Sequence, residues 1–507
     1  MEKFLNYAFD YSRQQFAPIA KVFQDQLAVL KQINIETEND AAEEGLIHQW
    51  NERIDRLQKL FDELDKVDNL LNATQPDVTK YKLLAIDLQR KLRGDEHNHE
   101  WEYAQLSIAQ GICFLNANEP DQAVLWFRIA IATLEKNYTH GTRAKGLRAL
   151  LANSLQRQGK QIETIREAEN ARWLEPNRSY ERVRLGEVYF NLSEFDRARA
   201  VWEEALLWSP DDPAIHVNLG VCYLKLAWNV RERAQRKILL EQSAKFLNQA
   251  LDLYESAQLQ EKGWAHHTLG RLHDELCEYS EAIANFTIAK NFGFAPLMTT
   301  FYLGWAYLRN KSYDECVQQF RWLIQEAEER IPAGEGDKAR AILNEIIEPE
   351  TGEQMPLGQV LAWAHLSMAF SYAERDANLN DALELAYKAD AYIIKLDNDA
   401  AKGRTWAARV DCEGWILFKQ NKIDVAITRF EQALALTAAA DAYLHLALSY
   451  EQKLQDSKDE AERRHLIARV HACCRHVDDL DLKQEYSQRV NDLRLRLQEK
   501  PQTKAEK

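Results

Sequence analysis

The chain of 507 residues carries a net charge of −15, and hydrophobic residues make up 46% of it. This acidity argues against nucleic acid as the main ligand, because phosphate binding needs a basic face. Only 18 glycines and 11 prolines occur, which is low for a β-rich or disordered chain and favours an all-helical protein.

The first 98 residues predict a helical hairpin followed by a third helix. Residues 1–35 have one apolar stripe, residues 41–72 have a heptad-like seam, and residues 80–93 continue the helical pattern. We interpret residues 1–98 as a cap over the open end of a helical stack. The same hairpin is also compatible with homo-oligomerisation.

Small residues then recur at a spacing of 34. Ala152, Gly186 and Gly220 are each 34 positions apart, and Gly270 and Gly304 repeat the interval. A large residue, two alanines, an aromatic residue and a proline follow at fixed offsets. The fullest copy consists of Gly186, Tyr189, Ala198, Trp202, Ala205 and Pro210. A fixed period of this length indicates a repeat architecture rather than one globular core.

The same offsets recur after Gly111 and Gly414. Over roughly residues 104–476 the chain therefore resembles the tetratricopeptide repeat family, whose unit is a helix–turn–helix. The resemblance implies an all-α fold, a right-handed superhelical solenoid of such repeats with helical N- and C-terminal caps.

Two breaks in the period divide the chain. Extra residues follow Tyr223, and the basic stretch within them, residues 231–237, is interpreted as a solvated helix face. The larger break, at residues 331–358, is rich in Gly and Pro. We predict a first repeat block at 99–330, an insertion at 331–358, a second block at 359–476, and a capping helix with a polar tail at 477–507.

The sequence carries no motif that predicts catalysis. It lacks a phosphate-binding loop, a nucleophile elbow and an H-E-x-x-H helix. His465, His471, Cys473, Cys474 and His476 fall on one predicted helix, where adjacent cysteines point in different directions, so we interpret them as packing and surface residues rather than a zinc site. We therefore expect a non-enzymatic protein without a cofactor or metal.

The N-terminus lacks the pattern of a signal peptide, and no run of 18 apolar residues occurs. Seven cysteines without a framework suit a reducing compartment. We expect a cytoplasmic protein that does not span or bind a membrane.

The family resemblance implies that the first helix of each repeat lines a concave surface that binds a peptide or helix. Counting from each small residue gives the predicted partner-binding residues: Asn153, Arg157, Arg184, Glu187, Asn191, Asn218, Lys225, Trp264, His267, Arg271, Phe301, Trp305 and Arg309. The face changes from polar to aromatic along the chain. Aromatic side chains here either mark a binding surface or pack between first helices.

These features predict a scaffold or adaptor that binds a protein or peptide partner in the concave groove. The alternative is a regulatory or sensor subunit that controls a separate effector enzyme, a peptidase or signalling ATPase, through a change in repeat conformation. A regulator changes shape on binding, whereas a scaffold need not.

Overall fold

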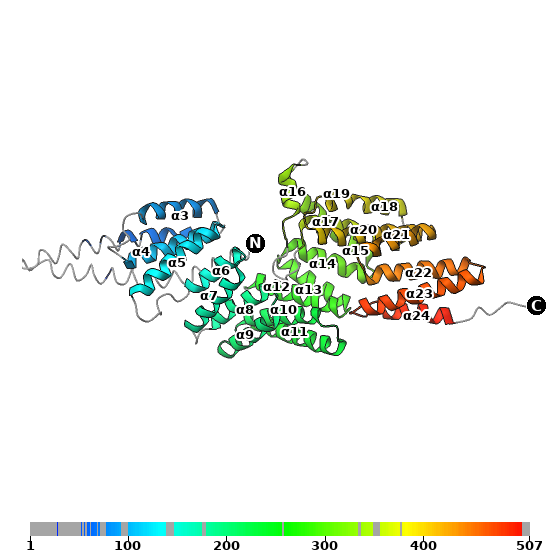
Figure 1. The fold of residues 1–507 in the computed structure, drawn as a ribbon, viewed down its shortest axis with the longest axis horizontal. Helices are drawn as coiled ribbons and strands as arrows, with labels where there is room; N and C mark the ends of the chain where they lie inside the picture. The colour runs from blue at the N-terminus through cyan, green and yellow to red at the C-terminus, as the bar shows by residue number, and fades with distance from the viewer. Residues whose placement is uncertain are drawn as a thin grey trace, which may run out of the picture. The chain divides into compact units, whose positions relative to one another are not determined.

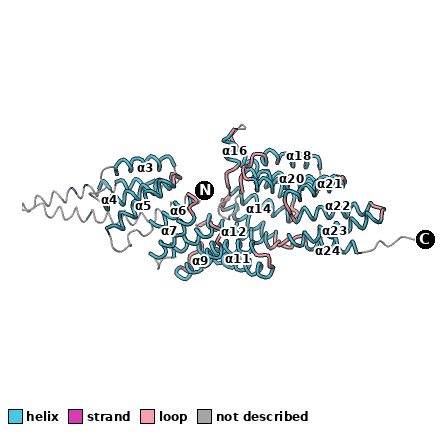
Figure 2. Tube along the Cα trace, in the orientation of Figure 1, coloured by secondary structure: helices cyan, strands magenta, loops and turns pink. Residues whose placement is uncertain are grey.

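The computed structural model describes residues 78–92, 100–137, 147–174, 179–255, 258–332, 336–347, 355–375 and 378–498, with residue 28 and some residues between 52 and 70. Within these ranges every regular element is a helix, apart from an isolated bridge between Ile346 and Pro356 (Figure 2). Most of the predicted hairpin at 1–72 lies outside the described residues. None of the described helices combines the length and the hydropathy that crossing a bilayer requires.

The chain forms two compact units, Met1–Pro210 and Asp211–Lys507, here called unit 1 and unit 2. The helices of unit 1 are α3 (Val78–Leu92), α4 (Glu100–Asn116), α5 (Pro120–Asn137), α6 (Leu147–Arg157), α7 (Gln161–Leu174), α8 (Ser179–Asn191) and α9 (Phe195–Trp208) (Figure 1). Helix α3 confirms the third predicted helix. The remaining helices pack as three consecutive hairpins, α4 with α5, α6 with α7 and α8 with α9.

Unit 2 continues the same arrangement. Its helices are α10 (Pro213–Asn229), α11 (Arg233–Leu253), α12 (Leu259–Glu275), α13 (Tyr279–Asn291), α14 (Pro296–Arg309), α15 (Tyr313–Glu328), α16 (Asp337–Leu343), α17 (Leu357–Glu374), α18 (Leu379–Lys388), α19 (Asp390–Ile393), α20 (Asp399–Lys419), α21 (Ile423–Leu436), α22 (Ala440–Asp456), α23 (Glu460–Leu480) and α24 (Ser487–Gln498). Both units are stacks of helical hairpins, which confirms the predicted all-α solenoid. The predicted block boundaries at 98, 330, 358 and 476 stay a prediction.

The turn between the two helices has the same geometry in six of the repeats. The residue seven positions after the small residue adopts a left-handed backbone; these residues are Asn118, Gly159, Ser193, Cys277, Lys311 and Asn421. In the best copy of the repeat, the Glu194 N–H donates to the Tyr189 carbonyl at 2.9 Å, and the Ser193 N–H donates to the Phe190 carbonyl at 2.9 Å. This is a Schellman motif, which satisfies the last carbonyls of the first helix and turns the chain directly into the second helix.

The two helices of a repeat approach most closely at the small residue. A Cβ atom added to Gly304 would lie 2.7 Å from the ring of Phe320, which is fully buried. The equivalent Gly186 faces Trp202, whose indole N–H donates to the Val183 carbonyl at 3.0 Å. The absence of a side chain on the first helix is therefore what lets the aromatic ring of the second helix pack against its backbone.

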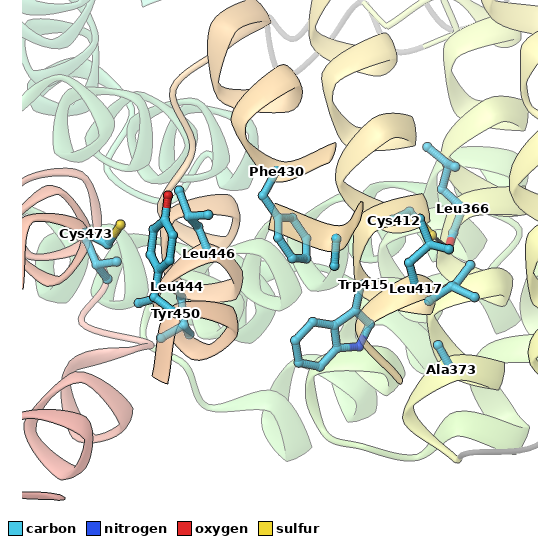
Figure 3. Packing of buried hydrophobic residues seen from close by; sticks show 14 of the residues in the cluster. Leu366, Ala373, Cys412, Trp415, Leu417, Phe430, Leu444, Leu446, Tyr450 and Cys473 are labelled. Atoms are coloured by element: carbon cyan, nitrogen blue, oxygen red, sulfur yellow. Dashed lines mark hydrogen bonds between the residues drawn. The ribbon is translucent and has the colours of Figure 1, made fainter. Parts of the chain in front are cut away.

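The units predicted around Ala369, Gly414 and Ala447 share one core. Figure 3 shows Trp415, Phe430 and Leu446 among its side chains, which come from α20, α21 and α22. Cys412 and Cys473 also lie in this core, and burial raises the pKa of the Cys473 thiol to about 11.

The break after Tyr223 lengthens α11 to 21 residues. The interpretation of its basic stretch as a solvated face was wrong for Arg236, of which only 6% is exposed. Its guanidinium donates to the Ala227 carbonyl at 3.3 Å and forms an ion pair with Glu275. The reason is that α11 packs against α12, so its inner side is buried.

We predict that Gly304→Ala destabilises the α14–α15 hairpin by about 1–3 kcal/mol, because the new methyl group overlaps the Phe320 ring. Native-state hydrogen exchange followed by mass spectrometry reports the local unfolding free energy of these two helices.

Gly403→Ala is the matched control for Gly304→Ala. Gly403 lies within α20, and nothing lies within 4 Å of its added Cβ. This substitution should stabilise α20 by about 1 kcal/mol through helix propensity alone. Equal effects of the two substitutions would contradict the close-packing argument.

Candidate functional site

Two positions of every first helix form a row, here called the inner row. They lie one and five residues after the small residue, so they are one helical turn apart on the same side of the helix. In unit 1 the inner row includes Asn153, Arg157, Glu187 and Asn191. In unit 2 it includes Lys225, Arg271, Glu275, Trp305 and Arg309. Eight of the predicted partner-binding residues therefore occupy equivalent positions.

In unit 1 the inner row borders a small cavity between α6 and α8. The cavity has a volume of about 30 Å³, and Asn153, Arg184, Glu187 and Asn191 are among its lining residues. Arg184 donates to the Glu187 carboxylate at 2.9 Å. Within the described residues, Asn153 Oδ1 is buried without a hydrogen-bond partner. The structure thus brings four predicted residues together in the lining of one cavity, whose volume suits a single polar group.

Arg157 has a different environment. Its guanidinium donates to the Leu115 carbonyl at 2.9 Å, and burial lowers its pKa. Arg157 therefore ties its repeat to the preceding one.

In unit 2 the inner row builds a buried cluster of cations and aromatic rings. Lys225 Nζ lies 3.9 Å from the centre of the Trp228 ring, and the Arg271 guanidinium lies 4.8 Å from the same ring and 4.0 Å from that of Tyr302. Only 5% of Lys225 and 7% of Arg271 is exposed. Asn218 is buried as well. Cation–π contacts at such desolvated positions are stronger than at the surface, so these side chains also hold the repeats together.

His267 and Phe301 are core residues. His267 is 1% exposed, its Nδ1 lies 3.0 Å from the Thr299 hydroxyl, and its ring packs edge-on against Phe286. Phe301 packs edge-on against Phe320. Their burial therefore supports the interpretation that these two rings pack between helices.

Trp264, Trp305 and Arg309 are less buried. The rings of Trp305 and Trp363 lie 5.3 Å apart, and within the described part of the chain the indole N–H of each lacks an acceptor. The N–H of Trp264 is in the same state. All three nitrogen atoms are buried, although parts of the Trp264, Trp305 and Trp363 side chains are exposed.

Arg309 is held by acidic groups that the sequence analysis missed. The guanidinium lies 3.6 Å from Asp274 Oδ2 and 3.3 Å from Glu485 Oε2. Burial opposes the charged form, but the two carboxylates outweigh it and raise the pKa of Arg309. Burial likewise opposes ionisation of Asp274, yet Arg309 and Lys483 lower its pKa. No local signal predicts these pairs, since Glu485 and Arg309 are far apart in the sequence.

A second cavity of about 490 Å³ lies beside α15 and α17 in unit 2. Arg321, Glu328 and His365 are among its lining residues. His365 is 7% exposed and stacks on Tyr392, whose hydroxyl donates to Glu328 at 2.5 Å. Burial lowers the pKa of His365 to about 4, so the ring is neutral at neutral pH.

The histidines and cysteines of α23 do not converge. Cys473 and Cys474 face the core, whereas His465 and His476 are exposed. Among the described residues, no three side chains with metal-binding groups come close enough to hold an ion.

The tetratricopeptide repeat family matches residues 183–227 and 413–466, one segment around Gly186 and Gly220 and one from Gly414 onward. The predicted resemblance to tetratricopeptide repeats is confirmed for these two segments. Both contain the close contact between the small residue and the aromatic ring and the left-handed turn described above. No curated protein sequence matches the chain.

Several solved structures of helical proteins are similar in part. The apo form of RapI has a TM-score of 0.49 at 13% identity, covering 75% of this chain and 97% of that one. NprR in complex with its cognate peptide NprX has a TM-score of 0.41 at 14% identity, covering 64% and 85%. A human IFIT1 dimer with m7Gppp-AAAA has a TM-score of 0.42 at 15% identity, covering 87% and 95%. Similarity at this level identifies no ligand for the present chain.

We predict that His365 makes unit 2 sensitive to acid. The folded pKa of about 4 lies below the ordinary value of 6.5, so as pH falls the unfolded chain binds the proton first. The stabilisation is present above pH 6.5 and is lost as pH falls toward 4. His365→Phe should remove this loss, which amounts to at most about 3 kcal/mol.

Thermal unfolding at pH values between 7 and 4 tests the His365 prediction. The stability of His365→Phe relative to wild type should rise as pH falls. His465→Phe, at an exposed position of α23, is the control and should follow the wild-type profile. Parallel profiles for wild type and His365→Phe would contradict the assignment.

Proposed function

We propose that the chain is a non-enzymatic scaffold that binds a peptide or helix of a partner protein on the face formed by the first helices of its repeats. The observation that carries the proposal is the cavity of unit 1, which Asn153, Arg184, Glu187 and Asn191 line and where, among the described residues, the Asn153 side-chain oxygen has no hydrogen-bond partner. Side-chain amides and an ion pair at repeated positions suit the backbone and charged side chains of a peptide.

The family supports this proposal in a general way, because tetratricopeptide repeats mostly serve protein interaction rather than catalysis. The half-buried Trp264, Trp305 and Arg309 of unit 2 are of the aromatic and cationic kinds that dominate many protein interfaces. Lys225, Arg271 and His267 are too buried to form the contact surface, and their part in the proposal is to hold the first helices in place.

We predict that Glu187→Arg with Asn191→Arg abolishes partner binding, because two long cations fill the cavity and remove the acceptor of Arg184. The test is affinity capture from lysate of the source cells by the full chain, with quantitative mass spectrometry. A protein captured by wild type should fall by about ten-fold or more, as expected for central interface positions.

Asp196→Arg with Ala200→Arg is the matched control for this pair of substitutions. It adds the same charge on the exposed side of α9, the second helix of the same repeat. The control should capture the partner as wild type does, and circular dichroism should show equal helicity for all three chains. Equal capture by all three would refute binding at this face.

A further inference from the structure

The connection between α23 and α24 crosses to helices that lie some two hundred residues earlier in the chain. We call residues 481–486 the strap. Lys483 Nζ lies 2.9 Å from Asp274 Oδ2 and 3.0 Å from Glu275 Oε1, at the end of α12. Glu485 Oε2 lies 3.3 Å from Arg309, at the end of α14. The strap therefore contacts α12 and α14 of its own unit through one basic and one acidic side chain.

The strap has a defined shape of its own. The buried Asp481 carboxylate accepts the backbone N–H groups of Glu485 at 3.1 Å and Tyr486 at 2.7 Å. Gln484 adopts a left-handed backbone with φ of 63°. These features replace the first turn of the predicted C-terminal helix, which begins only at Ser487. Lys483 and Glu485 are thus presented by a fixed turn rather than by a loose tail.

The positions under the strap belong to the inner row. Glu275 and Arg309 lie five residues after Gly270 and Gly304, as Arg157 and Asn191 lie five residues after Ala152 and Gly186. The strap thus covers, in unit 2, positions equivalent to those where the proposed function places a partner in unit 1. Within unit 2, the strap also bounds a cavity of about 470 Å³ that Trp228 and Asp441 help to line.

The ion pairs between the strap and helices α12 and α14 could be replaced by those of a partner. The ion-paired side chains of Asp274, Arg309, Lys483 and Glu485 keep between 19 and 23% of their surface exposed, so water screens the pairs in part. Leu482 and Tyr486, the apolar side chains of the strap, are only half-buried. A partner with one basic and one acidic side chain can form the same ion pairs in place of Lys483 and Glu485. Asp274 and Arg309 then keep a partner of opposite charge.

We propose that the strap is an intramolecular occupant of the first-helix face of unit 2, and that the partner which displaces it presents a basic side chain two residues before an acidic one. This inference rests on the proposed function and names the chemistry of its partner. Because the strap is tethered, its effective concentration is high, and it weakens every competing peptide.

The probe is a fluorescein-labelled peptide with the sequence of residues 479–490, titrated against the full chain by fluorescence anisotropy. We predict that Lys483→Ala with Glu485→Ala in the chain lowers the Kd of this peptide by about ten-fold or more relative to wild type, because the face is vacated. Arg489→Ala with Asp492→Ala, on the exposed side of α24, makes the same charge change and should bind as wild type does. A peptide with the Lys and Glu exchanged should not bind any of the chains.

Equal affinity of all three chains for the peptide, or binding to none, would overturn the inference and leave the strap as a structural brace. If circular dichroism shows that the alanine variant loses helicity, Lys483→Gln with Glu485→Gln tests the same step with the side-chain length kept. The peptide titration and the lysate capture can fail independently of each other. Release of the strap with unchanged lysate capture by Glu187→Arg/Asn191→Arg would refute only the proposed function, and the converse result would refute only the strap.

Discussion

The contact between a small residue on one helix and an aromatic ring on the next determines the geometry of each repeat. Where Gly111, Gly270 or Gly414 stands, the ring of Phe127, Phe286 or Phe430 occupies the place of the missing Cβ. Each ring is fully or almost fully buried. The contact fixes how closely the two helices approach. It therefore also fixes which side of the first helix does not face the second helix. Interiors tolerate little change in volume, so this one contact constrains the whole hairpin.

The inner row follows from that contact. Once the small residue faces the second helix, the residues one and five positions later point to another side of the first helix. The Schellman turn begins two residues beyond the second of these positions, which keeps the register the same from one repeat to the next. Several side chains of the row, among them Arg157, Lys225 and Arg271, hold neighbouring repeats together. In unit 2 the row includes Lys225, Glu275, Arg309 and Lys419, three cations and one carboxylate.

The sequence predicts the fold well because its signals are local. The offsets from Gly186 to Trp202 and Pro210 lie within one hairpin and state which residues touch. The candidate site is less predictable, because burial depends on neighbouring repeats. Arg271 looks like a surface cation from its own helix, yet Trp228 and Tyr302, from the preceding and following hairpins, enclose it. Aromatic neighbours thus convert predicted contact residues into core residues.

The strap could not be predicted from the sequence either, because its contacts join residues that are even farther apart in the chain. Lys483 and Asp274 are 209 positions apart, and the repeat pattern carries no information about contacts at that distance. The sequence predicts a capping helix within residues 477–507, but it does not show that the Asp481 carboxylate accepts two backbone N–H groups just before α24 begins at Ser487. Because the Asp481 side chain accepts the N–H groups of Glu485 and Tyr486, these residues form a turn rather than the start of a helix.

The two units consequently offer different chemistry on equivalent positions. In unit 1, among the described residues, the buried Asn153 side-chain oxygen lacks a donor. In unit 2 the strap pairs with Glu275 and Arg309 of the row and with the adjacent Asp274, so displacement of the strap exchanges one set of ion pairs for another. Such an exchange favours selectivity over affinity, because a partner with the wrong charge order leaves Asp274 and Arg309 facing like charges.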